Sequence, residues 1–228
     1  VSPLEQRVGR ETHRLTVTAG LRHQRDHQDR FGAVGTGPGG IRVDYDERFS
    51  AWLPKLSLAY AFSDAVNAGV LIQRAYNPGG TSISLARRVE DRFGAERLRN
   101  IEGFVRATFG GGRGTFAANL FHNRIRDAQR QLSVAVPVPG GGVIFATEFA
   151  NAPEATSYGL EAQVGWQWSR RLKLDGGIGL LRTRLDRTIL PTDPSLGKDF
   201  QRAPRLSAVA AIEWRPVDRW RRQRHGNA

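Results

Sequence analysis

The residues that most resemble a metal-ligand set are His23, His27 and Asp29, which lie on one face if this segment is extended. Imidazole and carboxylate groups are ligands for zinc and related ions. On a strand, however, residues i and i+4 are about 13 Å apart, too far to share one ion unless the strand bends. We therefore expect the polar stem of a hairpin here, with a metal site as the minor alternative.

Two glycine-rich segments, Gly35–Gly40 and Gly110–Gly114, could in principle cradle a phosphate. A P-loop needs a lysine and a helix directly after its glycines, and neither segment has them, so both are predicted to be turns. Paired carboxylates for acid–base chemistry, or a Ser-His-Asp order with suitable neighbours, are not visible. The absence of cysteine excludes disulfides and cysteine-based metal sites. We expect neither catalysis nor a bound cofactor.

Arginine dominates the charge of this chain, which has 34 Lys+Arg against 22 Asp+Glu, a net charge of +12. Such a balance raises nucleic acid as a partner, but the cations are spread along the chain rather than gathered on one helix or sheet face. Arginines around 22–48, 74–99 and 124–130 would attract anionic ligands or lipopolysaccharide phosphates. The alternative for any one of them is an ordinary solvated loop, as it is for the terminal run Arg221, Arg222 and Arg224.

The elements that position these residues are strands with two unlike faces. From Tyr158 to Trp168 every even residue is apolar or aromatic and every odd one is small or polar. This length is close to the roughly 9–11 residues with which a tilted strand crosses a bilayer. The same alternation predicts strands at approximately 14–25, 53–63, 65–76, 98–109, 115–127, 157–169, 172–185 and 203–215.

Short turns alternate with long loops between these strands. The pattern predicts an all-β fold, an antiparallel up-and-down transmembrane β-barrel segment of about eight strands with short periplasmic turns and long extracellular loops. Long loops are expected at 81–97, at 186–202 and at about 128–156, the last containing a projecting hairpin of 132–138 and 143–149. Four outward aromatic residues close strands before short turns and are expected to form a membrane girdle: Phe62, Phe109, Trp168 and Trp214. Polar residues on the opposite faces would line the lumen: Glu102, Arg106, Glu161, Asp175, Glu213 and Arg215.

Five segments together resemble TonB-dependent outer-membrane receptors. The most specific is Asn151-Ala-Pro-Glu-Ala-Thr-Ser-Tyr-Gly-Leu-Glu161, in which an Asn-Ala pair precedes an aromatic-Gly-aliphatic-Glu segment. The others follow in the family's order: Tyr76-Asn-Pro-Gly-Gly80, Glu96-Arg-Leu-Arg-Asn-Ile-Glu-Gly103, Leu120-Phe-His-Asn-Arg-Ile-Arg-Asp127 and Arg202-Ala-Pro-Arg-Leu-Ser207. The motif residues carried over are Asn77, Pro78, Gly79, Gly80, Glu102, Gly103, Asn151, Tyr158, Gly159, Glu161, Ala203, Pro204 and Arg205.

The resemblance implies a barrel of about 22 strands filled by an N-terminal plug domain. It also implies import of iron-siderophore complexes, haem, cobalamin or sugars across a Gram-negative outer membrane, with energy passed on by TonB. No plug, energy-coupling box or terminal aromatic strand is visible, so residues 1–228 are expected to be part of such a barrel, with lipid, lipopolysaccharide and a ferric siderophore or similar ligand as partners and no nucleic acid. Two alternatives remain: a complete eight-stranded barrel with a structural or adhesive role, and a soluble basic β-protein that binds nucleic acid.

Overall fold

The computed structural model describes residues 14–35, 39–138, 140–189 and 193–216. Within these ranges every regular element is a β-strand, and no helix is long and apolar enough to cross a membrane. The strands are β1 (Leu15–Val34), β2 (Ile41–Ser63), β3 (Val66–Asn77), β4 (Gly80–Ser84), β5 (Val89–Phe93), β6 (Glu96–Phe109), β7 (Gly114–Pro137), β8 (Val143–Ser169), β9 (Leu172–Arg187) and β10 (Leu206–Trp214).

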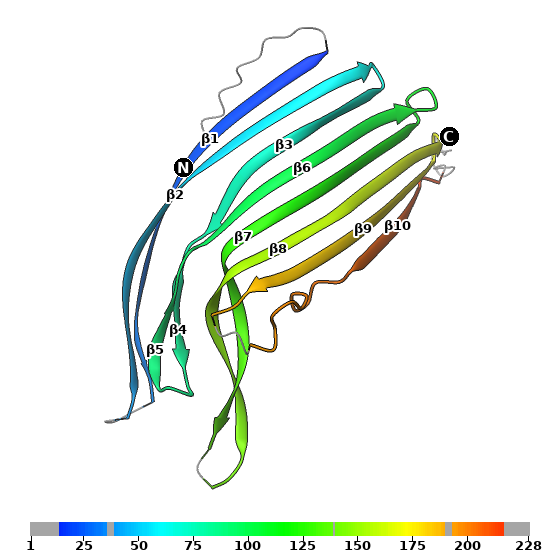
Figure 1. Ribbon diagram of the computed structural model, residues 1–228. Helices are drawn as coiled ribbons and strands as arrows, with labels where there is room; N and C mark the ends of the chain where they lie inside the picture. Colours follow the sequence, from blue (N-terminus) through cyan, green and yellow to red (C-terminus); the bar gives the residue numbers. More distant parts are fainter. Residues whose placement is uncertain (1–13, 36–38, 139, 190–192, 217–228) are drawn as a thin grey trace, which may run out of the picture.

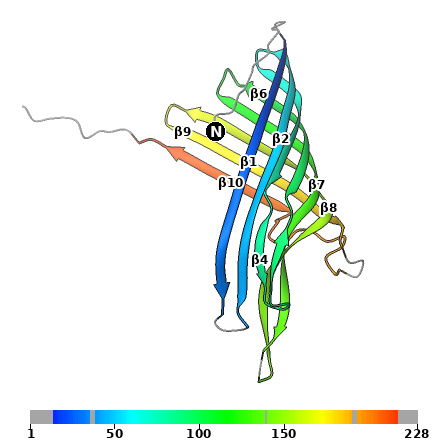
Figure 2. The same cartoon turned by 90° about the vertical axis from the view of Figure 1, so that its left-hand side faces the viewer.

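Eight of these strands form one antiparallel sheet in the order β1-β2-β3-β6-β7-β8-β9-β10, which confirms the predicted all-β up-and-down meander. The sheet curves strongly, as Figures 1 and 2 show from two sides. Among the described residues β1 and β10 are its two edges, and they do not pair with each other. The closed eight-stranded barrel considered above is therefore not what these strands form.

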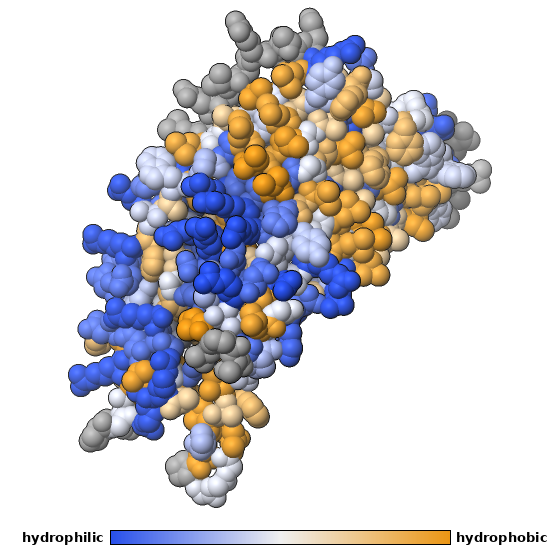
Figure 3. Space-filling view, viewed as in Figure 1, coloured by the Kyte–Doolittle hydropathy of each residue, from blue (hydrophilic) through white to orange (hydrophobic). Residues whose placement is uncertain are grey.

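The register places the predicted apolar residues of neighbouring strands opposite one another. Leu56 pairs with Ile72, and Ile72 pairs with Ile101 on the next strand. Because a slip of one residue would turn each set to the other face, the match along the whole sheet identifies one common apolar face. That face is the convex one, and its large side chains are exposed. Figure 3 shows it as a continuous hydrophobic area over the sheet strands.

The strands extend further than the sequence pattern predicted. β1 continues to Val34, beyond the expected strand end at residue 25, and pairs with β2 as far as Ile41, which agrees with the hairpin stem expected around His23, His27 and Asp29. β7 and β8 likewise run through the expected loop at 128–156, and the hairpin predicted there is their joint end, with Pro137 opposite Val143. The prediction stopped too early because it followed the apolar alternation, whereas backbone hydrogen bonding between the strands continues beyond the point where that alternation ends.

The expected loop at 81–97 is also wrong, because residues 80–93 form the hairpin β4–β5. This hairpin leaves the β3–β6 pair beyond Asn77 and Glu96 and lies inside the curve of the sheet, between the long ends of β1–β2 and β7–β8 (Figures 1 and 2). Other expected features lie partly or wholly outside the described residues: the centre of the glycine-rich turn at 35–40, part of the loop at 186–202, and the terminal run of Arg221, Arg222 and Arg224.

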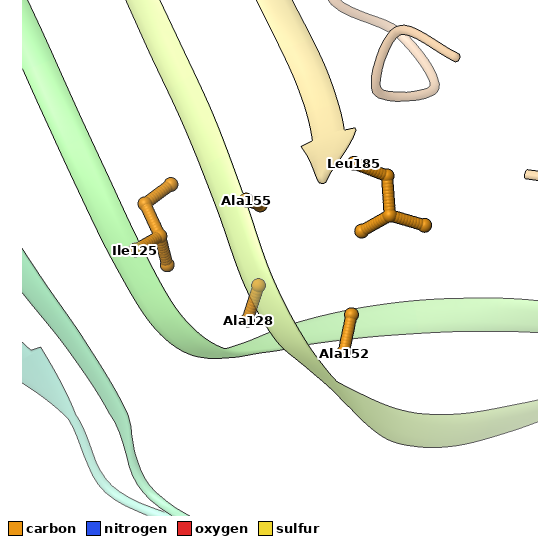
Figure 4. Close-up of a cluster of buried hydrophobic side chains, with 5 residues drawn as sticks. All are labelled: Ile125, Ala128, Ala152, Ala155 and Leu185. Carbon is orange, nitrogen blue, oxygen red and sulfur yellow. The ribbon is translucent and has the colours of Figure 1, made fainter. Parts of the chain in front are cut away.

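A small apolar cluster lies on the concave side, which otherwise carries mainly polar and small side chains. It is formed by Ile125 and Ala128 of β7, Ala152 and Ala155 of β8, and Leu185 of β9 (Figure 4). Leu98 and Phe200 pack against it. The cluster fixes the long ends of β7 and β8 relative to the sheet and to the segment before β10.

Candidate functional site on the concave face

A ladder of hydrogen-bonded side chains crosses the concave face next to the apolar cluster, on the side of the short turns. Gln73 donates to Asn100 (3.3 Å), Asn100 donates to Asn123 (2.8 Å) and Asn123 donates to Ser157 (3.1 Å). These residues lie opposite one another on β3, β6, β7 and β8. Because each amide satisfies the next, the ladder holds four strands at fixed spacing without exposing unpaired polar groups.

The short-turn end of the concave face is hollow. A cavity of about 740 Å³ lies there, lined by Arg106 and Asp175 together with Asn67, Thr115 and Gln163. Arg106 and Asp175 are two of the residues predicted to face inward, and Asp175 also pairs with Lys173 (2.9 Å). This part of the wall offers donors and acceptors to whatever fills the curve of the sheet.

The remaining predicted inward residues are spread along the same face. Glu102 lies opposite Leu71 and Phe121, and Glu161 lies opposite Asn119. Glu213 accepts a hydrogen bond from Arg215 (2.7 Å) near the end of the described chain. The structure therefore does not bring the four carboxylates together, and they form a polar lining rather than a single centre.

The base of hairpin β4–β5 is where several of the motif residues meet. Asn151 Oδ1 accepts a hydrogen bond from the Gly94 backbone amide (2.6 Å), and Asn151 Nδ2 donates to the carbonyls of Gly94 (3.0 Å) and Asp127 (2.6 Å). Asn77 donates to Glu96 Oε1 (2.9 Å) across the last pair of the β3–β6 ladder. These two asparagines hold the hairpin at the point where it leaves the sheet.

Gln129, which sequence reasoning missed, completes this base. Its amide donates to the carbonyls of Pro78 (2.8 Å) and Gly94 (3.1 Å), and its backbone amide donates to Glu96 Oε2 (2.8 Å). The carbonyls of Pro78 and Gly94 lie where the chain bends away from the sheet, so side-chain amides replace strand partners. A glutamine in a polar strand end gives no signal of this role in the sequence.

Gly79 and Gly80 are required by close packing rather than by backbone conformation. A Cβ on Gly79 would lie 2.8 Å from the Phe49 ring, and one on Gly80 would lie 2.7 Å from the Phe93 ring. Phe93 in turn stacks on Phe149 of β8 at 5.3 Å between ring centres. The two glycines therefore let the hairpin fold onto β2 and β8.

The motif residues of β6 and β8 have unlike environments. Gly159 lies beneath the Phe121 ring, where an added Cβ would meet the ring at 2.8 Å and the Leu180 carbonyl oxygen closer still. A Cβ at Gly103, in contrast, would meet nothing within 4 Å. Tyr158 is exposed on the convex face. Of these positions, only Gly159 is demanded by the local packing.

The motif at 203–205 joins the last described loop to β10. The Arg205 guanidinium donates to Asp199 Oδ2 from Nε (2.8 Å) and Nη2 (2.5 Å), and the Arg205 carbonyl accepts from the Leu181 amide (3.0 Å). The Arg205 guanidinium holds the pKa of the Asp199 carboxyl below its ordinary value. Ala203 and Pro204, which have apolar side chains, directly precede this anchor in the loop.

Charged groups concentrate where hairpin β4–β5 faces β2. Arg92 bridges Glu47 and Glu90 (both 3.3 Å) and lies over the buried Tyr45 ring, 5.3 Å from its centre. Burial opposes ionisation of Glu90, but hydrogen bonds from Thr81 and the Asp44 amide, with the charge of Arg92, lower its pKa overall. Burial, and secondarily the charge of Glu47, raises the pKa of Tyr45.

The histidines of β1 have separate partners. His23 stacks on Trp52, with ring centres 4.4 Å apart, and His27 Nε2 lies 2.6 Å from Asp46 Oδ1. Within the described residues no group of three or more histidines and carboxylates is placed to hold an ion.

An alternating antiparallel sheet with an apolar convex face, a polar concave face and an inward-folded hairpin defines a section of a β-barrel wall. Residues 5–228 match the family model "TonB dependent receptor-like, beta-barrel", so the chain belongs to the TonB-dependent receptor family.

Solved structures of receptors have the same fold at low sequence identity. The ferric yersiniabactin uptake receptor FyuA of Yersinia pestis matches 88% of this chain with a TM-score of 0.65 and 20% identity. The ferric-catecholate import receptor Fiu of E. coli K12 matches 91% with a TM-score of 0.64 and 13% identity. The alcaligin outer membrane receptor FauA of Bordetella pertussis matches 90% with a TM-score of 0.58 and 14% identity. The chain spans 29%, 30% and 32% of their respective lengths.

Proposed function

We propose that this chain is one section of the barrel of an outer-membrane TonB-dependent receptor in a Gram-negative bacterium, and that the receptor imports a ferric siderophore or a similar scarce anionic ligand. Family membership supports the receptor class. The open edges of β1 and β10, and the coverage of about a third or less of similar receptors, support a barrel with more strands. The polar concave face would then line the lumen and contact a plug domain.

The observation that carries the choice of ligand is hairpin β4–β5. It places Arg87, Arg88 and Arg92 at the long-strand end of the concave side, each with an exposed guanidinium. Arg92 is held over the buried Tyr45 ring by Glu47 and Glu90, whereas Arg88 donates to the Gly39 carbonyl and has no carboxylate partner among the described residues. Exposed guanidinium groups suit an anionic metal chelate with planar donor groups. An uncharged sugar would not need them.

The test uses the full-length receptor that contains this chain, expressed in cells that lack their own siderophore receptors. Uptake of radioactive iron with a panel of ferric siderophores should require TonB. The double variant R88Q/R92Q should weaken binding of the imported chelate by about 30-fold, since each of the two exposed charged hydrogen bonds contributes of order 1 kcal/mol.

The matched control is R170Q/R171Q, which removes the same charge from the short turn between β8 and β9. We expect that control to bind and transport like the wild type. Uptake that does not depend on TonB would contradict the receptor proposal. Equal effects of the two double variants would contradict the role given to the hairpin.

A further inference from the structure

The end of hairpin β7–β8 projects beyond the other strands (Figures 1 and 2). It has no charged residue from 131 to 147, although 25% of the residues of the chain are charged. Figure 3 shows hydrophobic residues on this projection, beside the mostly hydrophilic ends of the neighbouring hairpins. We call residues 131–138 and 140–147 the apolar arm. Exposed apolar strands invite aggregation and are normally protected by charges, so we expect a ligand to cover the arm.

One face of the apolar arm is a strip of aliphatic side chains. β7 contributes every second residue from Leu132 to Val136, and β8 contributes the residues opposite them. The pairs are Leu132 with Glu148, Val134 with Ala146, and Val136 with Ile144. The strip is about 13 Å long, from the rise of a strand over four residues. Ile144 at its outer end is 47% exposed and Ala146 only 9%, so the strip leads from solvent to a covered inner end.

The inner end of the strip meets the turn of hairpin β4–β5. The Ser84 hydroxyl donates to Glu148 Oε1 (2.5 Å), and the Arg87 backbone amide donates to Ser84 Oγ (3.1 Å). Arg88 follows in the same turn, and its exposed guanidinium donates to the Gly39 carbonyl (2.6 Å). It has no carboxylate partner among the described residues, so an uncompensated positive charge lies at the turn where the strip ends.

An apolar strip that ends beside such a charge complements an amphiphilic anion. The guanidinium of Arg88 still has donors for the anionic oxygens of a ligand head. An aliphatic tail that lies along the strip removes apolar area of both molecules from water. A chelate that is polar throughout would leave the strip exposed, and an uncharged lipid would not use the arginine.

We propose that the ligand is an amphiphilic ferric chelate, which places its anionic head at Arg88 and a fatty-acyl tail along the apolar arm. This inference rests on the proposed function, in which the long hairpins lie outside the membrane and capture an anionic chelate. It adds the chemical class of that ligand, a chelate that carries an acyl chain. The limited length of the strip suits a medium-length chain.

The test uses two ferric complexes of a citrate-based dihydroxamate, one with a decanoyl chain and one without it. Their binding to the full-length receptor is measured in lipid nanodiscs, with binding to empty nanodiscs subtracted. The wild type should bind the acylated chelate about 50-fold more tightly, which corresponds to the burial of about three methylene groups. Arg88→Gln should weaken binding of both chelates by the same factor.

Ile144→Thr tests the strip itself. Threonine keeps the β-branched shape that suits a strand but has less apolar area and a hydroxyl. This variant should bind the acylated chelate about tenfold more weakly and the deacylated chelate like the wild type. The matched control is Val143→Thr, because Val143 is the next residue of the strand, faces the other side of the arm and is 55% exposed. The control should bind both chelates like the wild type.

The outcomes separate this inference from the proposed function. A receptor that imports ferric chelates through TonB, but binds neither of the two chelates or binds both equally, would overturn the acyl site alone. Equal effects of Ile144→Thr and Val143→Thr would show that the tail does not lie on the strip. Cross-linking from a photoreactive residue at position 144 to another segment or another protein, without chelate, would also overturn the site, because the strip would already be covered. A receptor that imports no ferric chelate would overturn the proposed function itself.

Discussion

Replacing Asn151 by alanine should loosen hairpin β4–β5 while leaving the main sheet intact. The change removes three hydrogen bonds, two to the Gly94 backbone and one to the Asp127 carbonyl. Each is worth about 0.5–1.5 kcal/mol net, and water can reach part of this site, so we expect a loss of about 2 kcal/mol. The loss falls on local opening of the hairpin because β3, β6 and the other sheet strands keep their ladders.

Hydrogen exchange of the backbone amides measures this local opening. Amides of residues 80–93 should exchange about 30-fold faster in Asn151→Ala, because every 1.4 kcal/mol is about tenfold. Amides of β7 and β8 near the short turns should not change. Asn67→Ala is the matched control, since the Asn67 side chain is exposed and makes no hydrogen bond among the described residues. Unchanged exchange of the hairpin in Asn151→Ala would refute the clamp.

Three further predictions concern packing, pH and the membrane girdle. Gly159→Ala should destabilise the protein by about 1–3 kcal/mol in chemical unfolding because the new Cβ meets Phe121, whereas Gly103→Ala should be neutral or stabilising, and equal effects would contradict the packing argument. Since the folded-state pKa of Glu90 is lowered, its ionised form stabilises the hairpin above the ordinary value of 4.5, and this stabilisation should be lost as the pH falls through the lowered pKa. The protection of the hairpin amides relative to their intrinsic exchange rates should therefore fall at acid pH in the wild type and depend less on pH in Glu90→Gln. Trp168→Phe and Trp214→Phe should each reduce fluorescence quenching by lipids brominated near the interface, and unchanged quenching in both would exclude the girdle.

The sequence predicted the order of the strands and which residues lie on each face of the sheet, because a strand with one apolar face shows alternation with a period of two residues. In the register, Leu56, Ile72 and Ile101 meet as a row, although no two of them are close in the chain. The positions of the short turns also followed, since Ser63 and the glycines at 110–114 interrupt the alternation at one edge. These features depend on local pattern, which a single sequence carries.

The inward hairpin could not be predicted in the same way. Its strands are short, and its position depends on pairs distant in the sequence, such as Ser84 with the buried Glu148 (2.5 Å). The ion pair of Arg130 with Asp193 joins β7 to the segment before β10 and is equally nonlocal. Burial would raise the pKa of Asp193, but the Ser195 amide and Arg130 lower it overall. No sequence motif or regular spacing predicts either of these two pairs.

The residues that carry the family resemblance mostly hold the frame of the wall. Where β3 bends off the sheet, the carbonyls of Pro78 and Gly94 have no strand partner, and an unpaired backbone group there would cost stability. Asn151 and Gln129 supply the missing donors from neighbouring strands. A bend of this kind can be built by few residue types, whereas the exposed ends of the hairpin arginines follow no pattern that identifies a ligand. Family membership is therefore visible in the sequence while the identity of the ligand is not.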